Sequence, residues 1–235
     1  MKIKLDERLS AVVSFVLSGK PIADIGTDHA YLPVYIAIND ICPYVIAIDK
    51  RQMPYNKASK LVDLLALQNR IFVRMGDGLN ALYPGEVSTV TIAGLGGQLI
   101  INILMQDTKE VLSKVERLVL QPQKNVDTLR QWLSENSWCI TGEKMAYDDG
   151  FYYPVICAEP GKMQLNNVQK IYGPCLLKNP TPRFRDYLRQ KLTNLDALIQ
   201  QLEQKEGAEA IGRLKELYHD REEKKSILNS IAKKK

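Results

Sequence analysis

The sequence predicts an α/β fold with a mostly parallel sheet, followed by a helical extension. Short apolar, β-branched segments recur between residues 21 and 120, and each is followed by a loop and a stretch with helical periodicity. This alternation is typical of parallel strands joined by right-handed crossover helices. From residue 183 onwards, apolar residues are spaced three and four apart, which indicates packed helices.

The elements of the α/β part can be read in order. An amphipathic helix is expected over residues 5–17, and a later helix over 126–136. Five parallel strands are expected between these helices, at residues 21–25, 44–48, 71–73, 87–92 and 117–120. Two further segments, 138–145 and 152–158, flank Asp148-Asp149-Gly150, which is a strong hairpin signal. Five parallel strands and then an antiparallel pair indicate a Rossmann-like class I methyltransferase domain rather than a plain dinucleotide-binding domain.

Three segments organise the chain. Residues 1–160 are expected to form the α/β domain, and residues 161–182 a connector rich in Gly and Pro. Residues 183–235 are expected to form an antiparallel helical hairpin with coiled-coil packing. Its first helix carries apolar residues that alternate in spacing between four and three positions, namely Leu188, Leu192, Leu195, Ile199 and Leu202.

The charge is distributed unevenly along the chain. Residues 1–177 hold 18 Lys and Arg against 18 Asp and Glu, whereas residues 178–235 hold 14 against 9. The whole net charge of +5 therefore belongs to the last quarter. A basic extension on a neutral body suits a polyanionic partner, although solvated helix faces produce the same count.

Composition narrows the class of protein. The four cysteines form no CxxC pair and the chain has two histidines, so no metal site is predicted. The first eight residues mix both charge signs, unlike a secretory signal, and no apolar run approaches the roughly 18 residues of a membrane span. A cytoplasmic protein is expected.

Ligands of such sheets bind beyond the carboxyl ends of the strands, so the loops that follow the strands are the candidate site. The first loop, residues 23–30, carries Gly26 between acidic residues that disfavour a pyrophosphate. The second strand ends at Asp49, at the spacing where a carboxylate binds ribose hydroxyls. In the third loop, Gly76-Asp77-Gly78, a carboxylate between two glycines could accept a hydrogen bond from an adenine amino group. A cofactor with adenine and ribose but no phosphates, S-adenosylmethionine, fits these loops better than NAD does.

The fourth loop, Thr91-Ile-Ala-Gly-Leu-Gly-Gly97, resembles a dinucleotide loop but lacks its last glycine. Its glycines, Gly96 and Gly97 among them, would let a planar substrate approach the methyl donor, because a Cβ would block the way. An NAD-dependent oxidoreductase is the alternative that this loop favours. A non-catalytic RNA-binding protein that has kept the fold is a second alternative.

Five segments carry a more specific pattern than the glycine loops alone: Leu5 to Leu9 with Arg8, Ala23-Asp-Ile-Gly-Thr-Asp-His-Ala-Tyr-Leu-Pro33, Gly76-Asp-Gly-Leu79, residues 91–97 and Leu120-Gln-Pro122. In these segments the chain resembles the bacterial tRNA (adenine-22, ring nitrogen 1) methyltransferase family, TrmK, and the resemblance covers most of its length. It implies methylation of ring nitrogen 1 of an adenine in tRNA. Gln123 stands where the family commonly has Asn, and no role is predicted for it.

The resemblance also implies which residues form the site. The predicted S-adenosylmethionine ligands are Asp24, Gly26, Asp49, Gly76, Asp77, Gly78, Ala93 and Gly94. Arg8, Asp28, His29 and Tyr31 would lie toward the substrate. Asp28 is the candidate for stabilising or deprotonating the product, whereas His29 could equally be a histidine at a helix start, and Tyr31 could pack in the protein or stack on a base. The basic hairpin would hold the tRNA, and the protein is expected to be a monomer.

Overall fold

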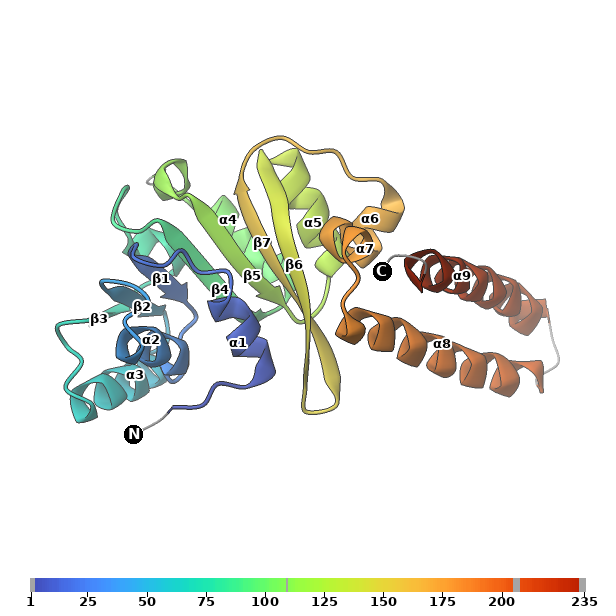
Figure 1. Ribbon diagram of the computed structural model, residues 1–235, viewed down its shortest axis with the longest axis horizontal. Helices are drawn as coiled ribbons and strands as arrows, with labels where there is room; N and C mark the ends of the chain where they lie inside the picture. The colour runs from blue at the N-terminus through green and yellow to red at the C-terminus, as the bar shows by residue number, and fades with distance from the viewer. Residues whose placement is uncertain (1–2, 109, 205–207, 233–235) are drawn as a thin grey trace. The chain divides into compact units, whose positions relative to one another are not determined.

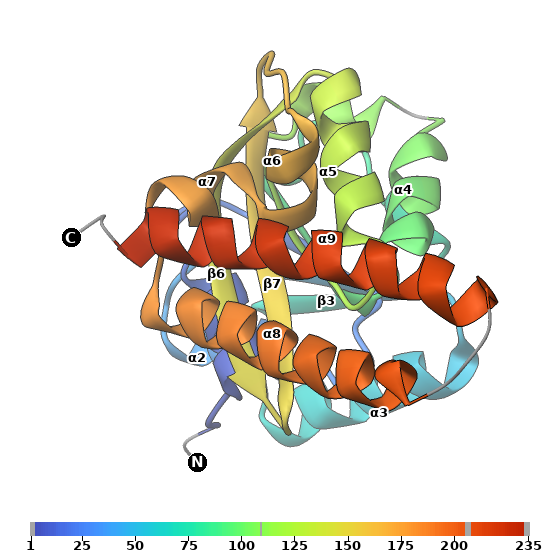
Figure 2. The same ribbon diagram turned by 90° about the vertical axis from the view of Figure 1, so that its right-hand side faces the viewer.

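The structure, a computed structural model, describes residues 3–108, 110–204 and 208–232, with side chains described from 211 in the last helix. The chain divides into two compact units, Met1–Pro174 and Cys175–Lys235, and each is described here by itself. The first unit contains the sheet, and the second contains two long helices (Figures 1 and 2).

The first unit is built around a seven-stranded sheet with the order β3-β2-β1-β4-β5-β7-β6. Its strands are β1 (Ile22–Ile25), β2 (Val45–Asp49), β3 (Ile71–Met75), β4 (Thr89–Leu95), β5 (Arg117–Pro122), β6 (Trp138–Asp148) and β7 (Phe151–Pro160). Strands β1 to β5 are parallel to one another, while β7 runs antiparallel to both β5 and β6. The predicted fold class is confirmed, since the sheet has the expected parallel strands and the antiparallel pair at one edge.

Helices cover both faces of this sheet (Figure 1). The helices and 3₁₀ turns of this part of the chain are α1 (Glu7–Val13), α2 (Tyr31–Ile38), α3 (Gln52–Leu64), η1 (Gly78–Ala81), α4 (Gly97–Met105), η2 (Val111–Lys114), α5 (Val126–Glu135) and α6 (Asn167–Tyr172). The first three lie on one face, and α4 and α5 lie side by side on the other. All residues of β1 and β2 are buried, as expected of central strands covered on both faces.

The first helix is shorter than predicted. It begins after Asp6, whose carboxylate accepts the N–H of Leu9 at 2.6 Å, and it ends at Val13 instead of residue 17. The Ser14 hydroxyl donates to the carbonyl of Ala11 at 2.7 Å just past the helix end. Apolar periodicity continues beyond this point because Val16 still packs in the core from a non-helical turn.

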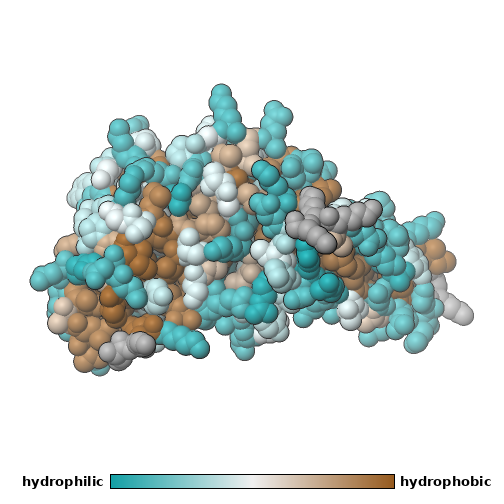
Figure 3. All heavy atoms as spheres, in the orientation of Figure 1, coloured by the Kyte–Doolittle hydropathy of each residue, from teal (hydrophilic) through white to brown (hydrophobic). Residues whose placement is uncertain are grey.

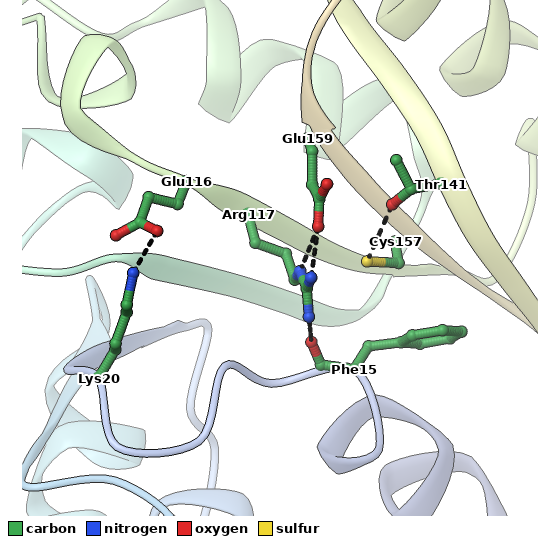
Figure 4. A network of polar contacts seen from close by, with 7 residues as sticks. All are labelled: Phe15, Lys20, Glu116, Arg117, Thr141, Cys157 and Glu159. Atoms are coloured by element: carbon green, nitrogen blue, oxygen red, sulfur yellow. Dashed lines mark hydrogen bonds and ion pairs between the residues drawn. The ribbon is translucent and has the colours of Figure 1, made fainter.

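Two ion pairs fix the connection between α1 and β1 at the amino end of the sheet (Figure 4). Arg117, the first residue of β5, donates to the carbonyl of Phe15 at 2.8 Å and also pairs with Glu159 of β7. Lys20 pairs with the neighbouring Glu116. The loop that leads into β1 is therefore held at the amino ends of the strands, whereas the ligand-binding loops lie at their carboxyl ends.

The hairpin turn of β6 and β7 has the predicted chemistry. Its central residues, Asp149 and Gly150, have φ values of 46° and 82°. Positive φ at both central residues is the requirement of a type I′ turn, which Asp-Gly meets at low cost. Figure 1 shows this hairpin extending beyond the neighbouring strands, beside α1.

A buried ion pair joins α5 to β6 in the first unit. The guanidinium of Arg130 lies 2.8 Å from the carboxylate of Glu143, and the two side chains are 2% and 0% exposed. Arg130 also donates to the carbonyls of Lys170 and Ile171 at the end of α6. The segment predicted as a Gly- and Pro-containing connector thus contains a helix, α6, that is hydrogen-bonded to the sheet domain.

The second unit begins within the short helix α7 (Pro174–Lys178) and continues with α8 (Pro182–Glu203) and α9 (Ala208–Ala232). The two long helices run antiparallel, as Figures 1 and 2 both show. Leu195 and Ile199 of α8 pack against Leu217 of α9, and Arg221 pairs with Asp196 across the same interface. The α8 N-terminus is capped by Thr181, whose side chain accepts the N–H of Phe184.

Candidate active site

The loops at the carboxyl ends of the parallel strands enclose two adjoining cavities. The first has a volume of about 350 Å³ and lies among the loops after β1, β2 and β3 and the helix α4. The second, of about 560 Å³, lies among the loop after β1, the end of β4 and the start of α1. Gly26, Arg51 and Leu95 line both cavities, so these three residues form the boundary between them.

Asp49 is the central polar group of the first cavity. Its side chain is 3% exposed, and its carboxylate accepts the backbone N–H of Arg51 at 2.8 Å. The guanidinium of Arg51 lies 3.3 Å from the same carboxylate but is itself 67% exposed. The hydrogen bond and the negative charge of Asp49 raise the pKa of Arg51. Gly76, Asp77 and Gly78 complete this wall, so together with Gly26 and Asp49 five of the predicted cofactor ligands meet here.

Two of these glycines are required by their surroundings. A Cβ on Gly76 would lie 2.6 Å from the Cβ of Ala81, and one on Gly78 would lie 2.9 Å from Ile103. Gly78 also has a φ of +58°, which favours glycine. The tight conformation of the third loop at the end of β3 therefore requires glycine at both positions.

Asp24 contributes a second buried carboxylate, one strand away from Asp49. It accepts a hydrogen bond from the Thr91 hydroxyl at 2.8 Å and lines the second cavity. Burial raises the pKa of Asp24, hydrogen bonds from Thr91 and Thr27 lower it in part, and the charge of Asp49 raises it further. Two neighbouring carboxylates of this kind favour a ligand that carries positive charge.

The second cavity brings together the residues predicted on the substrate side. Asp28, His29, Tyr31 and Arg8 all line it. The Nδ1 atom of His29 lies 3.1 Å from the carboxylate of Asp28, and its ring stacks on Tyr31 with a centroid distance of 5.3 Å. Tyr31 is 50% exposed, so part of its ring is accessible from the cavity side or from solvent.

Gln121 organises one wall of the second cavity, and sequence reasoning assigned it no role. Its side-chain oxygen accepts hydrogen bonds from the guanidinium of Arg8 at 3.1 Å and from the backbone N–H of Gly94 at 2.9 Å. The residue is fully buried. Gly94 has a φ of +77° and lies where β4 is irregular, between Ala93 and Leu95. One amide thus fixes α1 and the end of β4 relative to β5.

Other contributors were missed because nothing in the sequence sets them apart. Arg51 is an ordinary helix-start residue in the sequence, and Thr91 an ordinary β-branched strand residue. The Leu120-Gln-Pro122 motif did contain a signal, since an amide in the middle of an apolar strand end must find partners when it is buried.

Gly96 and Gly97 line neither cavity. The N–H of Gly97 donates to the carbonyl of Lys124 at 2.7 Å, and a Cβ there would lie 2.3 Å from the carbonyl oxygen of Asn125. Gly97 therefore meets a packing requirement against the β5–α5 loop, which is a different reason from close approach of a substrate. The side chain of Gln123 is exposed, and its backbone N–H donates to Leu95.

The described residues contain no group of three or more His, Cys, Asp or Glu side chains that could hold a metal ion. No helix within the described ranges is both long and apolar enough to cross a membrane.

The fold and the two cavities together define a Rossmann-like methyltransferase. A family model described as tRNA (adenine(22)-N(1))-methyltransferase, TrmK, matches residues 22–223. The chain belongs to this family.

Curated and solved relatives agree with the family. The tRNA (adenine(22)-N(1))-methyltransferase of Bacillus subtilis is 33% identical over 97% of this chain and 98% of its own length. The structure of Streptococcus pneumoniae Sp1610 in complex with S-adenosyl-L-methionine is 32% identical, with a TM-score of 0.84 over 96% of this chain and 100% of that one. M. capricolum TrmK in complex with S-adenosyl-homocysteine is 28% identical, with a TM-score of 0.80 over 97% and 99% of the two chains.

Proposed function

We propose that this protein transfers the methyl group of S-adenosylmethionine to ring nitrogen 1 of adenine 22 in tRNA. The observation that carries the proposal is the pair of adjoining cavities that share Gly26, Arg51 and Leu95 as their boundary. The first cavity holds Asp49 and Gly76-Asp77-Gly78, which are predicted to bind the adenosine portion. The second holds the residues predicted to face the substrate, together with the predicted donor ligands Asp24, Ala93 and Gly94. A group passed between them has only this boundary to cross.

The residues present fit S-adenosylmethionine as the methyl donor. Asp49 would accept hydrogen bonds from the ribose hydroxyls, and Asp77 would accept one from the adenine amino group. Asp24, Gly26, Ala93 and Gly94 would surround the methionine portion, where the carboxylates of Asp24 and Asp49 suit its positive charges. When bound, this group supplies an electrophilic methyl on a sulfonium centre. The first cavity, at about 350 Å³, is within the size range of small-molecule sites.

The protein's main contribution to catalysis is alignment. The lone pair of adenine nitrogen 1 is already available, so the reaction needs a straight approach to the methyl group more than it needs an activated nucleophile. Arg8 and Gly94, both held by Gln121, form a firm wall for the target base. Bringing that base out of folded tRNA costs roughly a few kcal/mol, and stacking on Tyr31 would recover about 1 to 3 kcal/mol.

The product ring is cationic unless it loses an amino proton. Asp28 would stabilise that charge or accept the proton, since its carboxylate lines the second cavity. His29 lies beside it and would orient the carboxylate through the 3.1 Å contact.

The remaining parts of the proposal concern the whole protein. The basic C-terminal hairpin, residues 183–235, would bind the tRNA backbone, while residues 1–160 bind the methyl donor. We further propose that the protein acts in the cytoplasm as a monomer.

The test is methylation of a defined substrate. Labelled S-adenosylmethionine is incubated with an unmodified tRNA transcript carrying A22, and with a matched transcript carrying G22. We expect 1-methyladenosine in the first and none in the second, as read by nucleoside mass spectrometry. Label in another nucleoside would contradict the proposal. Binding of the donor without any transfer would favour a non-catalytic RNA-binding protein, and binding of NADH alone would favour an oxidoreductase.

A further inference from the structure

Gly96 lies under the side chain of Lys124. A Cβ placed on Gly96 would lie 3.2, 3.5 and 4.0 Å from the Cε, Cγ and Cδ atoms of Lys124, and these are its three nearest neighbours. The lysine side chain therefore runs flat across the residue that precedes α4, in the space that any other side chain would occupy.

The backbone of Gly96 does not itself require glycine. Its φ and ψ angles are −69° and 144°, an extended conformation that alanine adopts equally well. Gly97 differs, because a Cβ there would collide with backbone atoms of residues 124 and 125. A Cβ at position 96 would therefore meet the side chain of Lys124 first, and that side chain would have to shift by a few tenths of an ångström.

This placement brings Lys124 next to the active site. Gly96 directly follows Leu95, which lines both cavities, and the side chain of Lys124 is exposed. Lys124 also follows the end of β5, the strand whose Gln121 holds the wall of the second cavity.

Charge distinguishes Lys124 from other cations on neighbouring loops. Lys50 lies 3.6 Å from Asp77, and Arg51 lies 3.3 Å from Asp49. Within the described ranges Lys124 has no carboxylate within ion-pair distance. Its charge is therefore available for an anion from outside the protein.

We propose that Lys124 binds a backbone phosphate of the tRNA close to the target nucleotide, and that Gly96 serves to position it. The inference rests on the proposed function, because it takes tRNA as the substrate. A lysine suits a phosphodiester as a single point charge, which fixes the position of the backbone without reading the base.

The test compares Lys124→Ala with Lys114→Ala. Lys114 is also exposed, but it precedes β5 and so lies near the amino end of that strand, away from the site. Its variant therefore removes the same charge at a distance from the active site. We expect Lys124→Ala to raise the KM for tRNA by roughly five- to tenfold at low salt, with the affinity for S-adenosylmethionine unchanged. The slope of log(kcat/KM) against log salt should become shallower by about 1. Lys124→Arg should retain most of the wild-type KM.

Gly96→Ala tests the positioning role. Alone, it should raise the KM for tRNA because the new methyl group displaces the lysine side chain. In the Lys124→Ala background it should have no further effect, since the side chain that it displaces is gone.

Equal KM values and salt slopes for Lys124→Ala and Lys114→Ala would overturn the inference, as would additive effects of Gly96→Ala and Lys124→Ala. Failure of the wild-type protein to methylate any tRNA would instead overturn the proposed function, so the two failures are distinguishable.

Discussion

Asp24 and Asp49 show how single residues prepare the site for its ligand. Both carboxylates are buried at the ends of neighbouring strands, and burial together with the charge of Asp49 raises the pKa of Asp24. Such a pair costs stability in the free protein and is relieved when a positively charged ligand binds. Asp49 has an additional partner in Arg51, whereas Asp24 accepts a hydrogen bond from the Thr91 hydroxyl.

Replacing Asp49 should remove donor binding while leaving the fold intact. In Asp49→Ala, each lost hydrogen bond to the carboxylate is worth about 1.5 to 3 kcal/mol, so two together lower the affinity at least about 100-fold. Titration calorimetry with S-adenosylmethionine measures this loss. Asp63→Ala, an exposed carboxylate on α3, serves as the control. Equal affinities for the two variants would show that Asp49 does not bind the donor.

Asp24→Asn should make the free protein more stable at neutral pH. The folded protein raises the pKa of Asp24, chiefly through burial, so it binds the proton more tightly than the unfolded chain does. The stability that this group contributes is therefore present below its unfolded pKa and is lost as pH rises through the folded pKa. In thermal unfolding from pH 4 to 8, the unfolding temperature of the variant should increase relative to that of the wild type as pH rises. A variant that is less stable than the wild type at pH 8 would contradict this.

The same substitution should weaken binding of S-adenosylmethionine, because the amide cannot balance the ligand's positive charge. At pH 8 we expect the ligand to raise the unfolding temperature of the wild type more than that of Asp24→Asn. A residue that is unfavourable for folding and favourable for binding is typical of a functional site.

Which residues could be predicted from the sequence depends on how their partners are arranged along the chain. Asp49 and Gly76-Asp77-Gly78 are recognisable because a loop after a strand carries them in a short, unusual string. Gln121 and Arg51 act through contacts to residues on other elements, and such pairings leave no local pattern. Gly96 and Gly97 stand out in the sequence as a glycine pair, but the residues that they pack against, Lys124 and Asn125, lie 27 to 28 positions further along the chain.

At the level of elements, one buried ion pair joins a helix and a strand. The pair Arg130 and Glu143 links α5 and β6, and the same guanidinium satisfies two carbonyls at the end of α6. Gly173 follows that helix, with a φ of +93° and no room for a side chain beside Glu143. The sequence indicated only a Gly- and Pro-containing connector here, because the pairing partners are 30 or more residues away.

Glu143→Gln should destabilise the protein by about 3 kcal/mol or more, since it leaves the buried charge of Arg130 uncompensated. The matched change Asp40→Asn breaks an ion pair of the same 2.8 Å length, but Asp40 is 81% exposed, so about 0 to 1 kcal/mol is expected. Urea unfolding of both variants measures the difference. Similar losses in the two would show that burial does not govern these pairs.

The boundaries of elements were less predictable than their order. Strands β1 to β5 appeared in the expected order, and the reason is clearest for β1 and β2, which are central and fully buried and therefore mostly apolar. The end of α1 was misplaced, since the apolar period of Leu9, Val12 and Val16 continues into a turn that packs in the same core.

At the level of the whole molecule, the two units suggest a division of labour. Deleting residues 183–235 should leave the affinity for S-adenosylmethionine unchanged and weaken tRNA binding strongly, because the deleted part carries the excess of positive charge. Calorimetry and filter binding at several salt concentrations measure the two affinities. Unchanged tRNA affinity after the deletion would refute the division.

The shared boundary of the two cavities also has a pharmacological consequence. An inhibitor with an adenosyl group in one cavity and an adenine in the other would need a linker only long enough to pass Gly26 and Leu95. Joining two weak ligands makes the second binding event intramolecular, so the affinity of the joined molecule can exceed that of either part by orders of magnitude. Selectivity against other methyltransferases would come from the second cavity, where Arg8 and the aromatic pair of His29 and Tyr31 are exposed to the ligand.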